Sequence, residues 1–167
     1  MLQALRKRLH NDEEGFTLIE LMVVVLIIAI LIAIAIPTFL GARGRANNRA
    51  AEANLRNALT AEKTIYTDNQ AYVDSTTTGA GSLASVEPAL KYTATAASAV
   101  QNGNVVFVSV SGTPATTVLL QEQAAGGGSC YTLQDTSGSG TQYGSAAGAC
   151  TGAAPANLAA TPSGGGW

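Results

Sequence analysis

The sequence has little charge and few aromatic side chains. Of its 167 residues, 12% are charged and 5% are aromatic, and the formal net charge is −2. So small a net charge creates no large field of either sign, which argues against a protein that coats nucleic acid or carries an acidic tail. With few aromatic residues, any core must be packed mainly with Val, Leu and Ala. The length is enough for one compact domain and one long helix, but not for two ordinary domains.

Histidine is almost absent, and with it much of the chemistry of catalysis. His10 is the only histidine, and it lies close to the N-terminus. The sequence also contains no phosphate-binding Walker loop, no Gly-x-Ser-x-Gly nucleophile turn and no cysteine pair with zinc spacing. We therefore expect neither an enzyme nor a cofactor or metal site.

One long apolar run divides the chain. Every residue from 21 to 36 is apolar, and with residues 16–20 in front of it the segment before Pro37 has 21 positions. A helix needs about 20 apolar residues to cross the hydrocarbon core of a bilayer. A basic group, Arg6, Lys7 and Arg8, precedes the run, so the positive-inside rule keeps the N-terminus in the cytoplasm. The run predicts one membrane crossing, with the rest of the chain outside.

Two other interpretations account for the hydropathy alone. A secretory signal peptide has an apolar core of about 7–15 residues followed by a small-residue cleavage site, whereas this run is longer and has Glu20 in its first turn. A plain single-pass anchor has similar hydropathy but gives no reason for that carboxylate.

Glu20 is the residue that needs an explanation. A carboxylate at this depth costs about 2.5–3.5 kcal/mol on insertion scales, so it should have a partner. Thr17 and the start of the helix can donate hydrogen bonds, but neither supplies a full positive charge. A cut between Gly15 and Phe16 would supply one, because a free α-amino group is largely cationic near neutral pH. We predict that the Phe16 amine of a neighbouring copy meets Glu20.

The segment GFTLIE, residues 15–20, resembles the prepilin peptidase recognition sequence of type IV pilins and related pseudopilins. The resemblance implies that the peptidase cleaves after Gly15 on the cytoplasmic side, and that the same enzyme N-methylates the new terminal residue, Phe16. It also implies that Glu20 neutralises the terminal amine of the adjacent subunit during assembly. Pro37 matches the proline that interrupts the long helix in this family.

The resemblance and the composition together divide the chain into four parts. The expected parts are a leader at 1–15, a transmembrane and polymerisation helix at 16–40, its amphipathic continuation at 41–72, and a globular β head at 73–167. The head would carry a C-terminal disulfide loop and a flexible tail ending in Trp167. The expected fold class is α+β, with the long N-terminal helix packed on a small antiparallel sheet.

A weak point is predicted where the two halves of the helix meet. Pro37 has no amide hydrogen, and Gly41 and Gly44 lower helix propensity further. We expect a gentle kink over 37–44 in the isolated subunit and local unwinding there in the filament, as the family resemblance implies.

The amphipathic continuation should bury one face and expose the other. Its apolar stripe, expected to pack on the sheet, consists of Ala51, Leu55, Ala58, Leu59, Ile65 and Tyr66. The other face carries Arg45, Arg49, Glu52, Arg56 and Lys63. A solvated surface is the simpler interpretation of these arginines, and contact with anionic lipid or with acidic patches of neighbouring subunits is the alternative.

The head is predicted from short β-prone runs separated by turn residues. The pattern predicts adjacent antiparallel strands at 105–110 and 116–120, and a third strand that includes 129–133. The predicted sheet has three or four strands. Tyr131 and Tyr143 could lie in the core or at the surface.

Both cysteines, Cys130 and Cys150, lie in this head. They could be free thiols, but their position beyond the membrane segment, facing an oxidising exterior, favours a disulfide. Such a bond would stabilise the head by about 3 kcal/mol. Many pilins close a C-terminal loop in this way.

The expected function is that of a structural subunit of a type IV pilus. The alternatives are a minor pilin, a type II secretion pseudopilin or a subunit of a DNA-uptake pilus; a plain membrane-anchored surface protein is a third reading. The expected partners are other copies of the chain, the prepilin peptidase, the pilus assembly machinery and, before assembly, the membrane, but no nucleic acid for the subunit itself. The precursor would lie in the cytoplasmic membrane and the filament outside the cell. Twitching motility, adhesion, DNA uptake and secretion all stay open.

Overall fold

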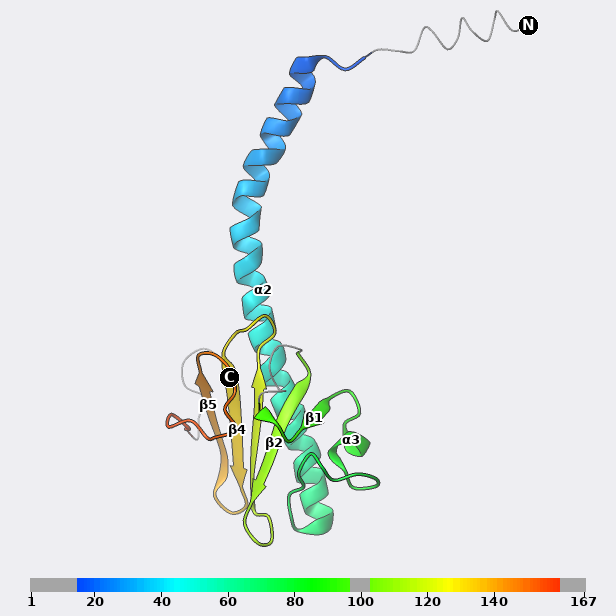
Figure 1. Ribbon diagram of the computed structural model, residues 1–167, viewed down its shortest axis with the longest axis vertical. Helices are drawn as coiled ribbons and strands as arrows, with labels where there is room; N and C mark the ends of the chain where they lie inside the picture. Colours follow the sequence, from blue (N-terminus) through cyan, green and yellow to red (C-terminus); the bar gives the residue numbers. More distant parts are fainter. Residues whose placement is uncertain (1–14, 97–102, 160–167) are drawn as a thin grey trace, which may run out of the picture. The chain divides into compact units, whose positions relative to one another are not determined.

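A computed structural model of the chain describes residues 15–96 and 103–159 (Figure 1). It divides into two compact units, Met1–Gly41 and Ala42–Trp167, which we describe separately. The predicted leader, apart from Gly15, and the predicted flexible tail at 161–167 lie outside the described residues. Helix α2, Leu18–Asn69, contributes to both units.

The described part of the first unit is the apolar half of α2 and the three residues before it. Its large apolar side chains are all exposed, from 48% for Ile28 to 89% for Phe16. The helix is long and apolar enough to cross a membrane, and none of its most apolar 18-residue window is buried within the chain. An exposed apolar surface of this size is typical of a membrane or protein interaction site.

Helix α2 continues without interruption through Pro37, where the sequence predicts a weak point. The hydroxyl of Thr38 donates to the carbonyl oxygens of Ile34 at 3.2 Å and Ala35 at 2.9 Å. These bonds are ordinary threonine side-chain bonds to the preceding turn and do not replace the one that proline, without an amide hydrogen, cannot donate. The kink and the unwinding in the filament stay predictions.

The second unit contains a five-stranded sheet in the order β1-β2-β3-β4-β5 (Figure 1). The strands are β1 Lys91–Thr93, β2 Val105–Ser111, β3 Thr117–Gln123, β4 Cys130–Thr136 and β5 Gly140–Ala146. A short helix, α3 Leu83–Val86, precedes β1. Strands β2 to β5 pair antiparallel, whereas β1 pairs parallel with β2. The predicted α+β class is confirmed, but the sheet is larger than expected: β1 and β5 are additional, and β1 is not antiparallel.

The core of this unit lies between α2 and one face of the sheet. The cross-strand partners Val108, Leu120 and Leu133 lie on that face and are at most 2% exposed. Of the predicted helix stripe, Ala51, Leu55, Ala58, Leu59 and Ile65 are buried, and Tyr66 is half-buried against the same core. The predicted packing of an apolar stripe on the sheet is therefore confirmed.

Glu52 departs from the prediction. The sequence places it on the solvated face of the helix, but its side chain is only 7% exposed. The buried ring of Tyr131 on β4 lies close enough for Glu52 to raise the pKa of the phenol, although burial is the larger cause. The sheet therefore covers a wider arc of the helix than the apolar stripe alone suggests. Tyr131 belongs to the core, and Tyr143 is half-buried.

Candidate functional site

The start of α2 is closed by two side chains. The amide and the hydroxyl of Thr17 both donate to Oε2 of Glu20, at 2.8 and 2.7 Å. In return, the amide of Glu20 donates to the Thr17 hydroxyl at 3.2 Å. Thr17 precedes the first helical residue and Glu20 is the third residue of the helix, which is the arrangement of a capping box.

This geometry gives Glu20 a local task that the sequence analysis overlooked. The spacing of a threonine and a glutamate three residues apart, just before an apolar run, is itself a signal for a helix start. The carboxylate also lies at the positive end of the helix dipole. Because all three hydrogen bonds are made within one exposed turn, the side chain is held in place at the helix start, where a further partner can reach it.

Gly15 and Phe16 lie just before this turn, outside the helix, and both are exposed. A Cβ atom added at Gly15 would meet no atom within 4 Å. Among the residues that the structure describes, none therefore sterically requires a glycine at this position. If cleavage requires a glycine here, as the motif predicts, that requirement comes from a partner outside the subunit and not from its fold.

The sequence-predicted site residues fall in separate places along the chain. Thr17 joins Glu20 at the helix start, Pro37 lies within the helix, and the cysteines lie in the head. The bonds of Glu20 to Thr17 arise within one copy. The predicted contact of Glu20 with the Phe16 amine concerns two copies and stays a prediction.

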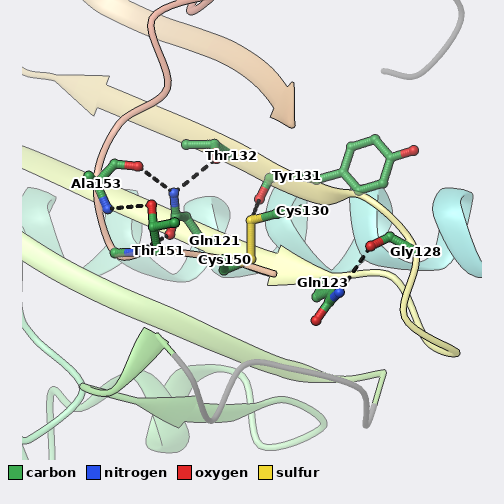
Figure 2. The surroundings of a disulfide bond; sticks show 10 residues. Gln121, Gln123, Gly128, Cys130, Tyr131, Thr132, Cys150, Thr151 and Ala153 are labelled. Atoms are coloured by element: carbon green, nitrogen blue, oxygen red, sulfur yellow. Dashed lines mark hydrogen bonds between the residues drawn. A yellow bond between two sulfur atoms is a disulfide. The ribbon is translucent and has the colours of Figure 1, made fainter. Parts of the chain in front are cut away.

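Cys130 and Cys150 form a disulfide, as predicted (Figure 2). Both residues are buried, on the face of the sheet opposite α2. The amide side chain of Gln121 on β3 holds the segment after Cys150: its nitrogen donates to the carbonyl oxygen of Ala153 at 2.7 Å, and its oxygen accepts from the amide of Gly152 at 2.9 Å. The disulfide and this glutamine together fix the C-terminal segment on the sheet.

Besides Glu52, three buried carboxyl groups lie between α2 and the sheet or the segment after the helix: Glu62, Glu122 and Asp135. Asp135 on β4 pairs with Lys63 at 3.2 Å and accepts hydrogen bonds from Tyr72 and Thr141. Burial by itself would raise the pKa of Asp135, but these hydrogen bonds and Lys63 lower it. Asp135 is therefore a charged, fully partnered group that ties the helix to two strands.

Glu62 and Glu122 have no such partner. Burial raises the pKa of Glu62 to about 8 and that of Glu122 to about 7. Glu62 accepts from the amide of Val73 at 3.2 Å, and Glu122 accepts from Asn54 at 2.9 Å and from the amide of Asn104 at 3.0 Å. Within the described part of the chain neither carboxyl forms an ion pair, and no three His, Cys, Asp or Glu side chains gather as a metal site.

Comparisons with known proteins bear on the N-terminal segment. Residues 10–36 match the family model described as the prokaryotic N-terminal methylation motif. The chain is 45% identical over 67 residues to the type IV major pilin protein PilA of Myxococcus xanthus. It is 45% identical over 62 residues to the type IV wide pilus major component PilA4 of Thermus thermophilus. In the part that is matched, the chain is therefore similar to type IV major pilins.

The similarity to these pilins is partial. It covers 40% of this chain and 30% of the Myxococcus protein, and 37% of this chain and 47% of the Thermus protein. The chain thus spans less than half the length of each relative. No solved structure matches it significantly. The matched motif includes Gly15, Phe16, Glu20 and the apolar run up to residue 36, so the similarity lies at the candidate site itself.

Proposed function

We propose that this chain is a structural subunit of a type IV pilus, assembled through its N-terminal helix. The observation that carries the proposal is the fully exposed apolar half of α2, headed by Glu20 and a matching methylation motif. Leaving an apolar side chain of this size in water, instead of burying it, costs about 1.5–3 kcal/mol of free energy. Once it leaves the membrane, this helix has to be covered by others of its kind.

Processing comes before assembly. The prepilin peptidase removes residues 1–15 by cutting after Gly15, and Phe16 becomes the N-methylated first residue. The accessible, non-helical backbone at Gly15 and Phe16 supports this proposal, as does the absence of any steric need for a glycine within the subunit. The motif match supports the methylation of Phe16 in particular.

Assembly then pairs the new amine with Glu20 of a neighbouring subunit. A carboxylate and an ammonium about 4 Å apart attract far more strongly in an apolar bundle than in water. The capping box favours this role, because it holds the carboxylate of Glu20 at the helix start before the partner arrives. Each added subunit thereby aligns its helix with the one before it.

The four parts of the chain follow from this proposal. The leader at 1–15 is lost, 16–40 first spans the cytoplasmic membrane and later forms the filament core, 41–72 links it to the head, and 73–167 forms the outer surface. The partners are other copies of the chain, the peptidase and the assembly machinery. The subunit itself has a structural rather than an enzymatic role.

Mass spectrometry of the mature protein tests this proposal most directly. A chain that begins at methylated Phe16 and is recovered from sheared surface filaments is the expected result. A protein that begins at Met1 and stays monomeric in the membrane would overturn both the processing and the assembly.

A further inference from the structure

The charged side chains of α2 in the second unit are sorted by sign. The basic side chains of this part are all exposed: Arg43, Arg45, Arg49, Arg56 and Lys63. Glu52 and Glu62, in contrast, are buried, at 7% and 0% exposure. In the sequence these opposite charges partly offset one another. In the fold, the charged side chains that the helix exposes between residues 42 and 67 are all basic. The exposed helix surface is therefore more basic than the composition suggests.

Three of these arginines lie next to the apolar run. Arg43 comes three residues after Leu40, and Arg45 and Arg49 follow within the next six. A chain spans at most about 3.5 Å per residue, so Arg43 lies within roughly 11 Å of Leu40 in any conformation. The headgroup layer on each side of a bilayer is about 5–8 Å thick, and an arginine side chain can extend into it from either side. No acidic residue lies between Glu20 and Glu52, and of the three arginines only Arg49 is close enough to Glu52 to lower the pKa of that carboxyl.

We propose that Arg43, Arg45 and Arg49 form an arginine collar that binds anionic phospholipid headgroups in the outer leaflet of the cytoplasmic membrane. This inference rests on the proposed membrane residence of the precursor. Guanidinium groups pair with phosphate through two parallel hydrogen bonds and keep their charge at any physiological pH. Near an anionic surface each basic side chain strengthens binding by about fivefold. The collar holds the subunit in the membrane until the assembly machinery extracts it.

A neighbouring subunit has fewer exposed acidic groups for the collar to bind than an anionic membrane surface has. Beyond residue 40, Asp68 is the only acidic side chain of the described residues that is exposed, and Asp74 and Glu87 are half-buried. Asp68 lies 19 residues beyond Arg49 in the same helix. Lipid phosphates, in contrast, lie within reach of Arg43, at the start of the collar, through chain connectivity alone. Charge complementarity therefore favours lipid as the partner.

The test measures which lipids stay bound to the full-length chain. The protein is reconstituted in nanodiscs of equal parts phosphatidylglycerol and phosphatidylcholine, and the lipids retained after release are counted by native mass spectrometry. The variant Arg43→Gln/Arg45→Gln is compared with Arg56→Gln/Lys91→Gln, which removes the same charge from exposed positions farther from the apolar run. Circular dichroism verifies that both variants keep the helix.

We expect the wild-type chain to retain phosphatidylglycerol preferentially, and the collar variant, which lacks two arginines, to lose this preference by about 25-fold. The control variant should keep the preference, and Arg43→Lys/Arg45→Lys should keep most of it. Equal retention of both lipids by the wild type, or equal losses in the collar and control variants, would overturn the arginine collar alone. A chain that fails to enter the nanodiscs would instead overturn the proposed membrane residence.

Discussion

Thr17 and Glu20 hold each other across the first turn of α2, with the Thr17 amide 2.8 Å from Oε2 of Glu20. The same carboxylate is proposed to pair with an amine on another subunit. These two roles differ in what they need from residue 20. A helix cap needs only a hydrogen-bond acceptor, which a glutamine also supplies, whereas pairing with an ammonium needs the negative charge.

Substitutions at Glu20 separate these roles. Glu20→Gln preserves the acceptor and removes the charge, whereas Thr17→Ala weakens the cap and preserves the charge. If charge pairing drives assembly, both Glu20→Ala and Glu20→Gln are processed normally but produce at least about tenfold fewer filaments, since each loses an ion pair of more than about 1.4 kcal/mol. Thr17→Ala should assemble nearly as well as the wild type. Filaments are counted by electron microscopy, and cleavage is followed by immunoblot. Normal piliation of Glu20→Gln would show that Glu20 acts only in capping the helix.

Gly15 provides a test of processing that is independent of folding. The free space around its Cα predicts that Gly15→Leu leaves the helix intact. The uncut precursor should nevertheless accumulate in the membrane, because the bulky side chain blocks the peptidase rather than the fold. The measurement is the ratio of precursor to mature protein on immunoblots. Gly44→Ala, another change at a site with no atom within 4 Å, serves as the control and should be cut at the normal rate.

The sequence allowed the helix, the membrane-spanning run and the motif to be predicted, because all three depend on local patterns. Strands β1 and β5 were missed for different reasons. β1 has only three residues and pairs in parallel with β2, a contact that no turn signal announces. β5 has the sequence GTQYGSA, without an apolar alternation, and it is a strand because a turn returns the chain along β4.

The buried acidic residues were missed for a third reason. A glutamate next to arginines on a helix is predicted to face solvent. Whether it is buried instead depends on how wide a part of the helix the sheet covers, which the local sequence does not indicate. At the helix start, in contrast, the sequence carries the signal, because the spacing of Thr17 and Glu20 predicts the capping box that the structure contains.

The disulfide should contribute measurably to the stability of the head. Cys130 and Cys150 are 20 residues apart, and closing a loop of this size stabilises a fold by about 3 kcal/mol. Cys130→Ser/Cys150→Ser should therefore lower the midpoint of thermal unfolding by several degrees. Calorimetry of the wild-type chain with and without a reducing agent gives the same comparison without a mutation. An unchanged midpoint in both experiments would mean that Gln121 and the sheet hold the C-terminal segment on their own.

Glu62 and Glu122 make the stability of the head depend on pH. Glu62 faces the amide of Val73, the carboxylate of Asp74 and the phenols of Tyr72 and Tyr92, and none of these is a cation. Burial therefore raises the pKa of Glu62 from 4.5 to about 8. Glu122, which faces Asn54 on α2 and the amide of Asn104, has its pKa raised from 4.5 to about 7 for the same reason.

The sign of the effect follows from the proton each group binds. Between pH 4.5 and 8 the folded chain keeps a proton on Glu62 that the unfolded chain has released, and for Glu122 the window ends near pH 7. The free energy of unfolding should therefore fall as pH rises, by about 1.4 kcal/mol per pH unit for each group within its window. Denaturant titrations of the full-length protein in detergent at pH 5, 6.5 and 8 measure this slope.

The matched variants assign the slope to these two residues. Glu62→Gln/Glu122→Gln keeps both acceptors but cannot ionise, so its stability should change little between pH 5 and 8. Asp68→Asn removes an exposed acid and should keep the wild-type slope. Asp135 acts in the opposite direction: since hydrogen bonds lower its pKa despite burial, its contribution is lost only as the pH falls below its ordinary value of 3.8. Together these opposing groups place the greatest stability of the head between about pH 3.8 and 4.5. Equal stability of the wild type at pH 5 and pH 8 would show that the two glutamates are already charged in the folded chain.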